Sequence, residues 1–176
     1  HYDVVVVGGG HAGVESSLSA SKLGCSVALI TISSSSIARM SCNPAVGGVA
    51  KGHLLSEIDA LGGYMAVATD LSGVQFKTLN MSKGPAVRAP RVQVDKRTYE
   101  RVVKAEIFNA QNISLYEEEV SEILFSGYRC SGVKFLSGDV IYSSAVIITC
   151  GTFLCGVVHV GTNRSSAGRM GEEAST

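Results

Sequence analysis

A glycine-rich turn near the start of the chain has the residue types and spacing of a phosphate-binding loop. Gly8, Gly10 and Gly13 form a GxGxxG pattern directly after the apolar run YDVVVV. In such a turn the first glycine permits the tight bend, the second lets a pyrophosphate approach the backbone, and the third lets the next helix pack on the strand. The N-terminus of that helix stabilises negative charge. The pattern predicts a dinucleotide-binding site.

The second candidate for chemistry is Cys42, in the segment SCNPAVGG. A redox disulfide would need a second cysteine a few residues away, and the next one is Cys130, which disfavours that interpretation. The loop is polar and interrupted by proline and glycine, and Arg39 and Lys51 are near enough in sequence to favour a thiolate. Free cysteine is, however, among the most buried residue types. A reactive thiol and a structural thiol both stay open.

Other polar residues are weaker candidates. His11 lies inside the glycine loop and could contact a cofactor or cap the turn, whereas His53 is interpreted as structural. Between positions 77 and 104 there are eight basic residues and only two acidic ones. They could contact a phosphate backbone or a cofactor, or form a solvated face, and the aromatic interleaving of a stacking platform is missing. The eight are Lys77, Lys83, Arg88, Arg91, Lys96, Arg97, Arg101 and Lys104.

The elements that must position these residues begin with a parallel unit. A β-branched strand over residues 2–7, a helix over 11–23 and a buried strand over 26–32 predict a βαβ unit spanning 2–32. The following segment, 33–48, contains a serine run, Pro44 and a glycine pair, and we expect it to be a long functional loop.

After the βαβ unit, the spacing of apolar residues is first that of helices and then that of short strands. Leu54, Leu55, Ile58 and Leu61 recur at helical spacing and predict a second helix, and a third is expected from about Asp95 to Ala110. Short segments separated by turn residues then predict an antiparallel meander over about 113–142, followed by a closing buried strand over 145–151.

The choice of dinucleotide depends on the distal segments. An acidic residue usually follows the second strand and binds the ribose, but Thr31 stands there and no Asp or Glu occurs between Glu15 and Glu57. This disfavours a conventional NAD dehydrogenase. By fold analogy, a βαβ unit, further helices, a meander and a late strand ending in a glycine indicate a two-dinucleotide-binding flavoprotein with FAD.

Composition limits the class of protein. The chain has 176 residues, 45% hydrophobic and 17% charged, with no net charge, and therefore suits one globular domain or part of one. The five cysteines are scattered and include no CxxC pair, so we expect neither a disulfide framework nor a metal site. No apolar run approaches the roughly 20 residues that a membrane span needs. We expect a cytoplasmic protein, or a mitochondrial one in a eukaryote.

Longer strings of the sequence resemble one family, the FAD-binding subunit of the tRNA uridine 5-carboxymethylaminomethyl modification enzyme, also called the glucose-inhibited division protein A family. The resemblance covers Tyr2 to Glu172. It rests on YDVVVVGGGHAG, MSCNPAVGG, KGHLLSEIDALGG, GVQF, LNMSKGPAVRAPRVQVDK, GTFLCGVVHVG and AGRMGE.

The resemblance implies an α/β fold: a glutathione-reductase-type, FAD-binding Rossmann-like domain with a small antiparallel β-meander. Proteins of this family are longer, so residues 1–176 would be the first segment of that domain and inactive alone. The implied reaction installs an aminomethyl or carboxymethylaminomethyl group at C5 of the wobble uridine of tRNA. It uses NADH as reductant and methylenetetrahydrofolate as one-carbon donor, in a homodimer acting with a GTPase partner.

The resemblance also implies roles for individual residues. Cys42 would be a catalytic thiol that adds to uracil C6 or transfers a proton. FAD contacts would come from Gly8, Gly9, Gly10, His11, Ala12, Gly13, Val120 and Ser166. The chain has TNRSSAGR where the family usually has a different string before its arginine, which weakens the assignment of Ser166. Two alternatives are an FAD-dependent reductase of another substrate and a non-catalytic dinucleotide-binding fragment.

Overall fold

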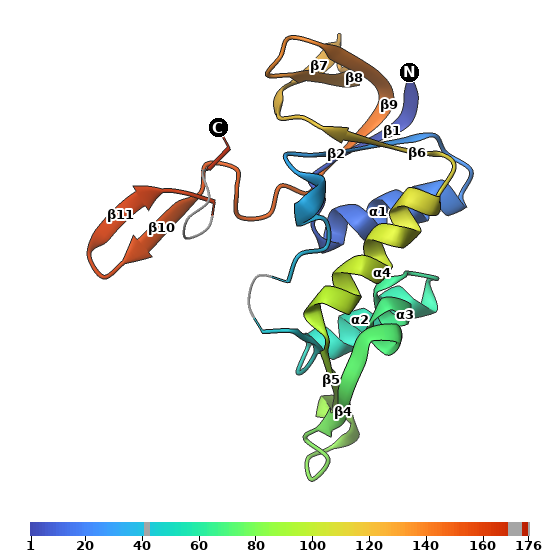
Figure 1. Ribbon diagram of the computed structural model, residues 1–176, viewed down its shortest axis with the longest axis vertical. Coiled ribbons are helices and arrows are strands. Elements are labelled where there is room, and N and C mark those ends of the chain that lie inside the picture. Colours follow the sequence, from blue (N-terminus) through green and yellow to red (C-terminus); the bar gives the residue numbers. More distant parts are fainter. Residues whose placement is uncertain (41–42, 169–173, 176) are drawn as a thin grey trace.

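The computed structural model describes residues 1–40, 43–168 and 174–175. Its central element is a six-stranded sheet of order β6-β2-β1-β9-β8-β7 (Figure 1). Strands β1 (Tyr2–Val7), β2 (Val27–Thr31), β6 (Ile113–Glu117) and the second half of β9 (Val140–Ile148) run parallel. Their carboxyl ends therefore meet at one edge of the sheet. The predicted α/β class is confirmed.

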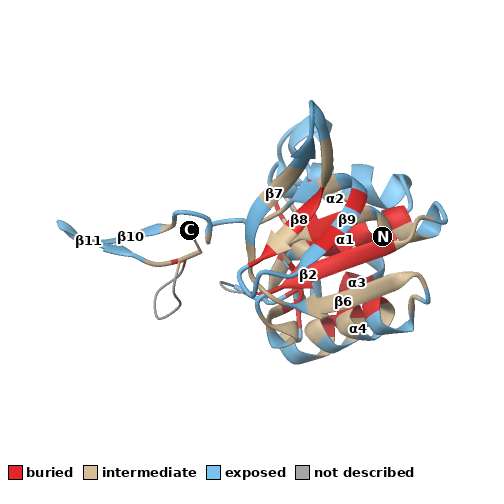
Figure 2. Cartoon of the chain, turned by 90° about the horizontal axis from the view of Figure 1, so that it is seen from above, coloured by how far each residue is buried: buried red, intermediate tan, exposed pale blue. Residues whose placement is uncertain are grey.

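The central strands β1 and β2 have buried side chains on both faces of the sheet. Successive side chains point to opposite sides, so they pack against different layers. On one side, Val6 and Leu29 pack against helices α1 (His11–Lys22) and α4 (Lys96–Asn109). On the other side, Val5 and Ile30 pack against Val133, Phe135 and Ile141 of the meander. Figure 2 shows this buried centre in red, with exposed loops around it.

Helix α4 agrees with its sequence pattern. The Asp95 side chain accepts a hydrogen bond from the Thr98 backbone N–H at 2.7 Å and so caps the helix. The buried residues Tyr99, Val103 and Ile107 recur at a spacing of four and place one stripe of the helix in the core.

The meander differs from its expected range of 113–142. Strand β6 is not part of it, because β6 follows α4 and pairs in parallel with β2. The antiparallel strands are β7 (Val120–Ser126), β8 (Arg129–Phe135) and the first half of β9. The strand expected over 145–151 is likewise not separate: β9 runs without a break from Val140 to Ile148, pairing first with β8 and then with β1. One strand thus joins the meander to the parallel sheet.

A smaller layer follows the Cys42 segment. Strands β3 (Ala45–Gly47), β4 (Gly73–Leu79) and β5 (Ala89–Val94) form an antiparallel sheet of order β3-β5-β4. Helices α2 (Lys51–Ala60) and α3 (Met65–Ser72) lie beside it, and two short 3-10 turns, η1 (Ser34–Ser36) and η2 (Pro85–Val87), complete the connections. Neither α3 nor the β4–β5 hairpin was predicted from the sequence.

The apolar residues at helical spacing in and after helix α2 do not share one buried face, and of these Leu55 packs against the core. Leu54 is 60% exposed and Leu61 is 89% exposed. The helix instead approaches the sheet through Gly52, where a Cβ would lie 2.9 Å from the Pro90 carbonyl oxygen. Close backbone contact at this glycine fixes the rotation of the helix, so that Leu55 reaches the core while Leu54 faces solvent.

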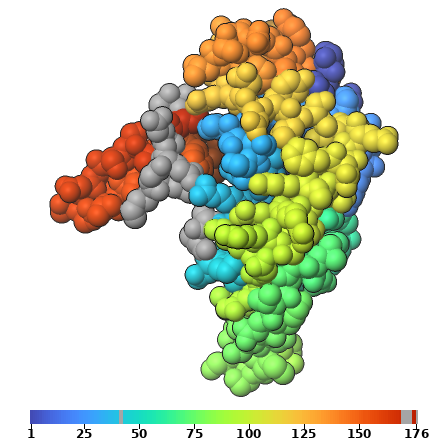
Figure 3. Space-filling model, in the orientation of Figure 1, coloured from blue at the N-terminus to red at the C-terminus, as the bar shows by residue number. Residues whose placement is uncertain are grey.

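The last two strands, β10 (Val157–Val160) and β11 (Asn163–Ser166), form a hairpin that extends away from the body (Figures 1 and 3). No helix among the described residues is long and apolar enough to cross a membrane.

Candidate functional site: the glycine loop and its surroundings

The glycine loop lies at the carboxyl edge of the parallel sheet, between β1 and α1. Gly8, the first residue of the loop, donates its backbone N–H to the Ile30 carbonyl at 2.8 Å. Its φ is +111°, a backbone conformation that residues with a side chain rarely adopt. A Cβ at Gly13 would lie only 1.8 Å from the Gly8 carbonyl oxygen. Both positions therefore require glycine, and helix α1 starts in direct contact with the turn that precedes it.

Thr149, directly after β9, fastens this turn to the neighbouring strand. Its backbone N–H donates to the Val7 carbonyl at 2.8 Å. Its hydroxyl lies 2.8 Å from the Val7 carbonyl and 3.0 Å from the Gly8 carbonyl, and its single proton is shared between these acceptors. The sequence pattern indicated a role for the end of this strand but not for the threonine itself, because the contact joins residues 142 positions apart.

The start of helix α1 fits a bound pyrophosphate. Gly10 is the N-cap residue, and no side chain caps the helix there. A Cβ added at Gly10 would meet no atom within 4 Å among the described residues, so the space over this backbone is open. The first N–H groups of a helix have no intrahelical acceptor and carry partial positive charge. An anionic group can therefore approach the backbone of Gly10, His11 and Ala12 closely.

An acidic residue that sequence spacing did not reveal lies beside Thr31, at the end of the neighbouring strand. Thr31 ends β2 beside Gly9, and its register partner on β6 is Glu117. The Glu117 carboxylate accepts a hydrogen bond from the Ser34 backbone N–H at 2.7 Å, which holds the pKa of this carboxyl below its usual range. The carboxylate comes from the adjacent strand, 86 positions after Thr31, and fixes the serine turn beside it.

The segment that leads to Cys42 starts at the glycine loop. The Ala38 backbone N–H donates to the Gly9 carbonyl at 2.9 Å, and the Met40 N–H donates to a Glu100 carboxylate oxygen at 3.3 Å. Ala38 and Met40 are both buried. Cys42 itself lies outside the described residues. The described chain continues at Asn43 and enters β3 at Ala45.

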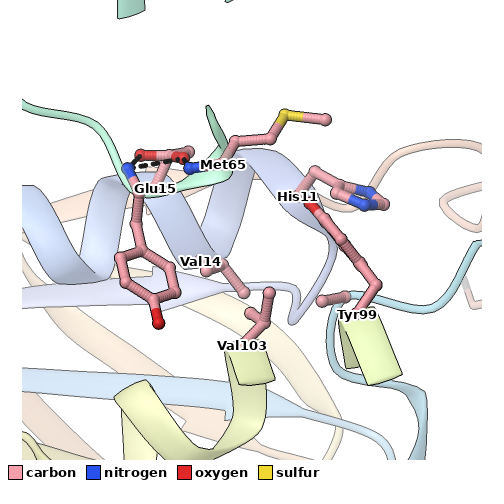
Figure 4. A pocket seen from close by; sticks show the side chains of 8 residues that line it. His11, Val14, Glu15, Met65, Tyr99 and Val103 are labelled. Atoms are coloured by element: carbon pink, nitrogen blue, oxygen red, sulfur yellow. Dashed lines mark hydrogen bonds between the residues drawn. The ribbon is translucent and has the colours of Figure 1, made fainter. Parts of the chain in front are cut away.

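The side chain of Glu15 on helix α1 holds α1 against the start of α3 (Figure 4). The Glu15 carboxylate accepts hydrogen bonds from the backbone N–H groups of Tyr64, at 3.0 Å, and Met65, at the start of α3. Burial and the charge of Glu15 raise the pKa of Tyr99, whose ring centroid lies 5.7 Å from that of His11. The cavity among these side chains is only about 10 Å³, space for one water at most. These side chains therefore form a packing contact and not a ligand pocket. His11, which lies in the glycine loop, packs against Tyr99 in this contact.

The two remaining expected FAD contacts have different settings. Val120 begins β7, three residues beyond Glu117, and thus follows the same edge of the sheet as the glycine loop. Ser166 ends β11, is exposed, and has Val157 as its register partner. Among the described residues, no backbone–backbone hydrogen bond joins this hairpin to the glycine loop.

The described cysteines give no sign of a disulfide or metal centre. Cys25, Cys130, Cys150 and Cys155 are free, and burial raises the pKa of the Cys150 thiol. Within the described ranges, no group of three or more His, Cys, Asp or Glu side chains could hold a metal ion.

The model of the family described as "Glucose inhibited division protein A" matches residues 3–176. The chain belongs to the glucose-inhibited division protein A family. It is 51% identical over 171 residues to the tRNA uridine 5-carboxymethylaminomethyl modification enzyme MnmG of Campylobacter hominis, covering 97% of the chain and 27% of that relative. The resemblance inferred from the sequence strings is thereby confirmed.

Solved structures agree with this membership. GidA of Aquifex aeolicus matches with a TM-score of 0.94 and 44% identity, covering 99% of this chain and 29% of that one. PqsL of Pseudomonas aeruginosa, described as a probable FAD-dependent monooxygenase, matches with a TM-score of 0.57 and 17% identity, covering 83% of this chain and 41% of that one. The second similarity concerns the fold alone. The chain spans less than a third of the length of its GidA-family relatives.

Proposed function

We propose that the complete protein is an FAD-dependent tRNA modification enzyme that installs the aminomethyl or carboxymethylaminomethyl group at C5 of the wobble uridine. The observation that carries this proposal is the identity to MnmG, which extends over almost the whole chain. The open glycine turn supports it, because a flavin dinucleotide needs a pyrophosphate site of this kind.

FAD would be held by the backbone of the glycine loop. Gly8 to Gly13 would receive the pyrophosphate, with Thr31 beside the ribose. Val120 and Ser166 are proposed as further contacts. Similarity of fold to PqsL, whose description names FAD, favours this cofactor over NAD alone. The flavin would supply hydride and electron transfer, with NADH as the reductant and methylenetetrahydrofolate as the source of the carbon unit.

Cys42 would be the chemical residue of this segment. As a thiolate it could add to C6 of uracil, which makes C5 nucleophilic, or it could act as the base that accepts the proton leaving C5. The Ala38 backbone is hydrogen-bonded to the glycine loop, and Cys42 follows Ala38 by four positions in the sequence. Four residues of chain span at most about 14 Å between the Cα atoms of Ala38 and Cys42. The loop is thus connected to the proposed cofactor site by a short tether.

The remaining properties belong to the longer protein. We propose a homodimer that acts with a GTPase partner on tRNA, and we do not expect the present segment to catalyse the reaction alone.

The test is conversion of wobble uridine in unmodified tRNA by the full-length protein and its GTPase partner. We expect Cys42→Ser to keep its FAD and lose modification, whereas Cys130→Ser, a matched change in β8, keeps both. A Cys42→Ser enzyme that modifies tRNA at the native rate would contradict the proposed role of this cysteine. A native enzyme that reduces FAD with NADH but never alters tRNA would favour the reductase alternative.

A further inference from the structure

The small sheet β3-β5-β4 has one face rich in hydrogen-bond donors. In its register Gln75 faces Gln93, and Lys77 faces Arg91. Because side chains alternate across a strand, these four lie on the same face. The third strand adds only Ala45 beside Gln93 and Gly47 beside Arg91. Small residues at these positions leave the two amides and two cations open to an approaching group. We call these four residues and the two small ones the basic face.

The charges on this face have no counter-charge in their own hairpin. From Gly73 to Val94 the sequence contains Lys77, Lys83, Arg88 and Arg91 and no acidic residue. Within the ranges that the structure describes, none of these four side chains forms a salt bridge. Lys77 and Arg91 are direct cross-strand partners, and like charges in that position destabilise an antiparallel pair. An anion bound between them would remove the repulsion.

The hairpin is held in place before any ligand binds. The Asn80 side-chain amide donates to the Val87 carbonyl at 3.1 Å, which closes the turn. His53 Nε2 lies 3.1 Å from the Ala86 carbonyl oxygen, and Gly48 donates its N–H to the Pro90 carbonyl at 2.7 Å. These bonds tie the hairpin to α2 and to the end of β3. The hairpin projects from the body at the bottom of Figures 1 and 3, where a large ligand could reach it.

The basic face is also joined directly to the candidate catalytic segment, since Ala45 follows Cys42 by three positions. A polynucleotide whose target base reaches Cys42 would have its neighbouring phosphates within a few residues' reach of this sheet. We propose that the basic face binds the tRNA backbone next to the target uridine, with the Arg91 guanidinium and the Lys77 ammonium on phosphate oxygens and the two glutamines as additional donors. This inference rests on the proposed function and adds the surface that recognises its substrate.

The experiment measures binding of unmodified tRNA to the full-length, FAD-loaded protein at several salt concentrations. The variants are Arg91→Gln and the double variant Lys77→Gln/Arg91→Gln. Arg129→Gln is the matched control, because Arg129 is an exposed arginine at the start of β8, at the opposite end of the molecule. We expect the double variant to bind tRNA at least about tenfold more weakly and the slope of log Kd against log salt to fall by roughly 0.7–0.9 per lost phosphate contact.

The charge-preserving exchange Lys77→Arg/Arg91→Lys should keep most of the salt slope. FAD content and the rate of flavin reduction by NADH should stay native in every variant, which separates a tRNA contact from a cofactor contact. Without tRNA, the double variant should unfold at the same or a higher temperature, because its like-charge pair is gone.

Native tRNA affinity and salt slope in the double variant would overturn the inference while leaving the proposed function intact. Slower reduction by NADH with native tRNA binding would overturn it in favour of a nicotinamide-nucleotide contact. A native protein that neither binds nor modifies tRNA would overturn the proposed function, and this inference with it.

Discussion

The hydroxyl of Thr149 gives a sharp test of how the glycine loop is kept ready for a dinucleotide. Its oxygen lies within 3.0 Å of both the Val7 and the Gly8 carbonyl oxygens, at the point where the chain turns from β1 into α1. The substitution Thr149→Val keeps the β-branched shape and removes only the hydroxyl. Val7 would still accept the Thr149 backbone N–H, so the loss falls mainly on Gly8.

The expected magnitude follows from the lost hydrogen bond. An intramolecular hydrogen bond contributes about 0.5–1.5 kcal/mol net, and a buried acceptor left without a donor costs about 1–3 kcal/mol. Because Thr149 is only half-buried, we expect the loss of its hydroxyl to cost about 1 kcal/mol. If this energy holds the loop in its binding conformation, FAD affinity should fall about fivefold, since 1.4 kcal/mol corresponds to a factor of ten.

The assay is titration of the full-length apoprotein with FAD, followed by flavin fluorescence, with thermal unfolding of the apoprotein measured alongside. Thr149→Ser is the control, because it keeps the hydroxyl and loses the methyl group, and it should bind FAD almost normally. A valine variant that binds FAD with the native Kd would refute the argument that this hydroxyl preorganises the loop.

Two further predictions concern the loop and the far side of the sheet. Gly10→Ala should leave the unfolding temperature unchanged, because the added Cβ meets nothing within 4 Å, yet it should weaken FAD binding by filling the proposed pyrophosphate space. Gly13→Ala should lower both the unfolding temperature and the FAD affinity, because its Cβ would collide with the Gly8 carbonyl. Equal unfolding temperatures for the two variants would contradict this account. The hydroxyls of Tyr2 and Tyr116 are 2.7 Å apart, and this bond raises the pKa of Tyr116 to about 12. Folding thus favours the protonated phenol, so the pair's contribution to stability is complete below about pH 10 and is lost as the pH rises through about 12. Absorbance titration of Tyr2→Phe should show the Tyr116 pKa falling toward 10, and an unchanged value would show that the bond is not its cause.

Local rules were sufficient where neighbours in sequence are also neighbours in space. The β-branched run at Tyr2–Val7, the glycine spacing after it and the cap at Asp95 each depend on residues within one turn or one strand, and each element has the predicted type. The same rules located the glycine loop and, by resemblance, the family. They could not orient α2, because its apolar stripe is correct for a helix while the close approach of Gly52 to Pro90 decides which side faces the protein.

By itself, the sequence determined the βαβ opening, the glycine turn and the family, since these depend on backbone preferences and on strings of adjacent residues. Only the tertiary structure decided that Glu117 stands beside Thr31, that Thr149 fastens Gly8, and that Lys77 and Arg91 face each other across β4 and β5. The physical reason is that each of these pairs is formed by strand pairing between segments distant along the chain. Register and strand order fix those pairs, and no local preference of either residue contains that information.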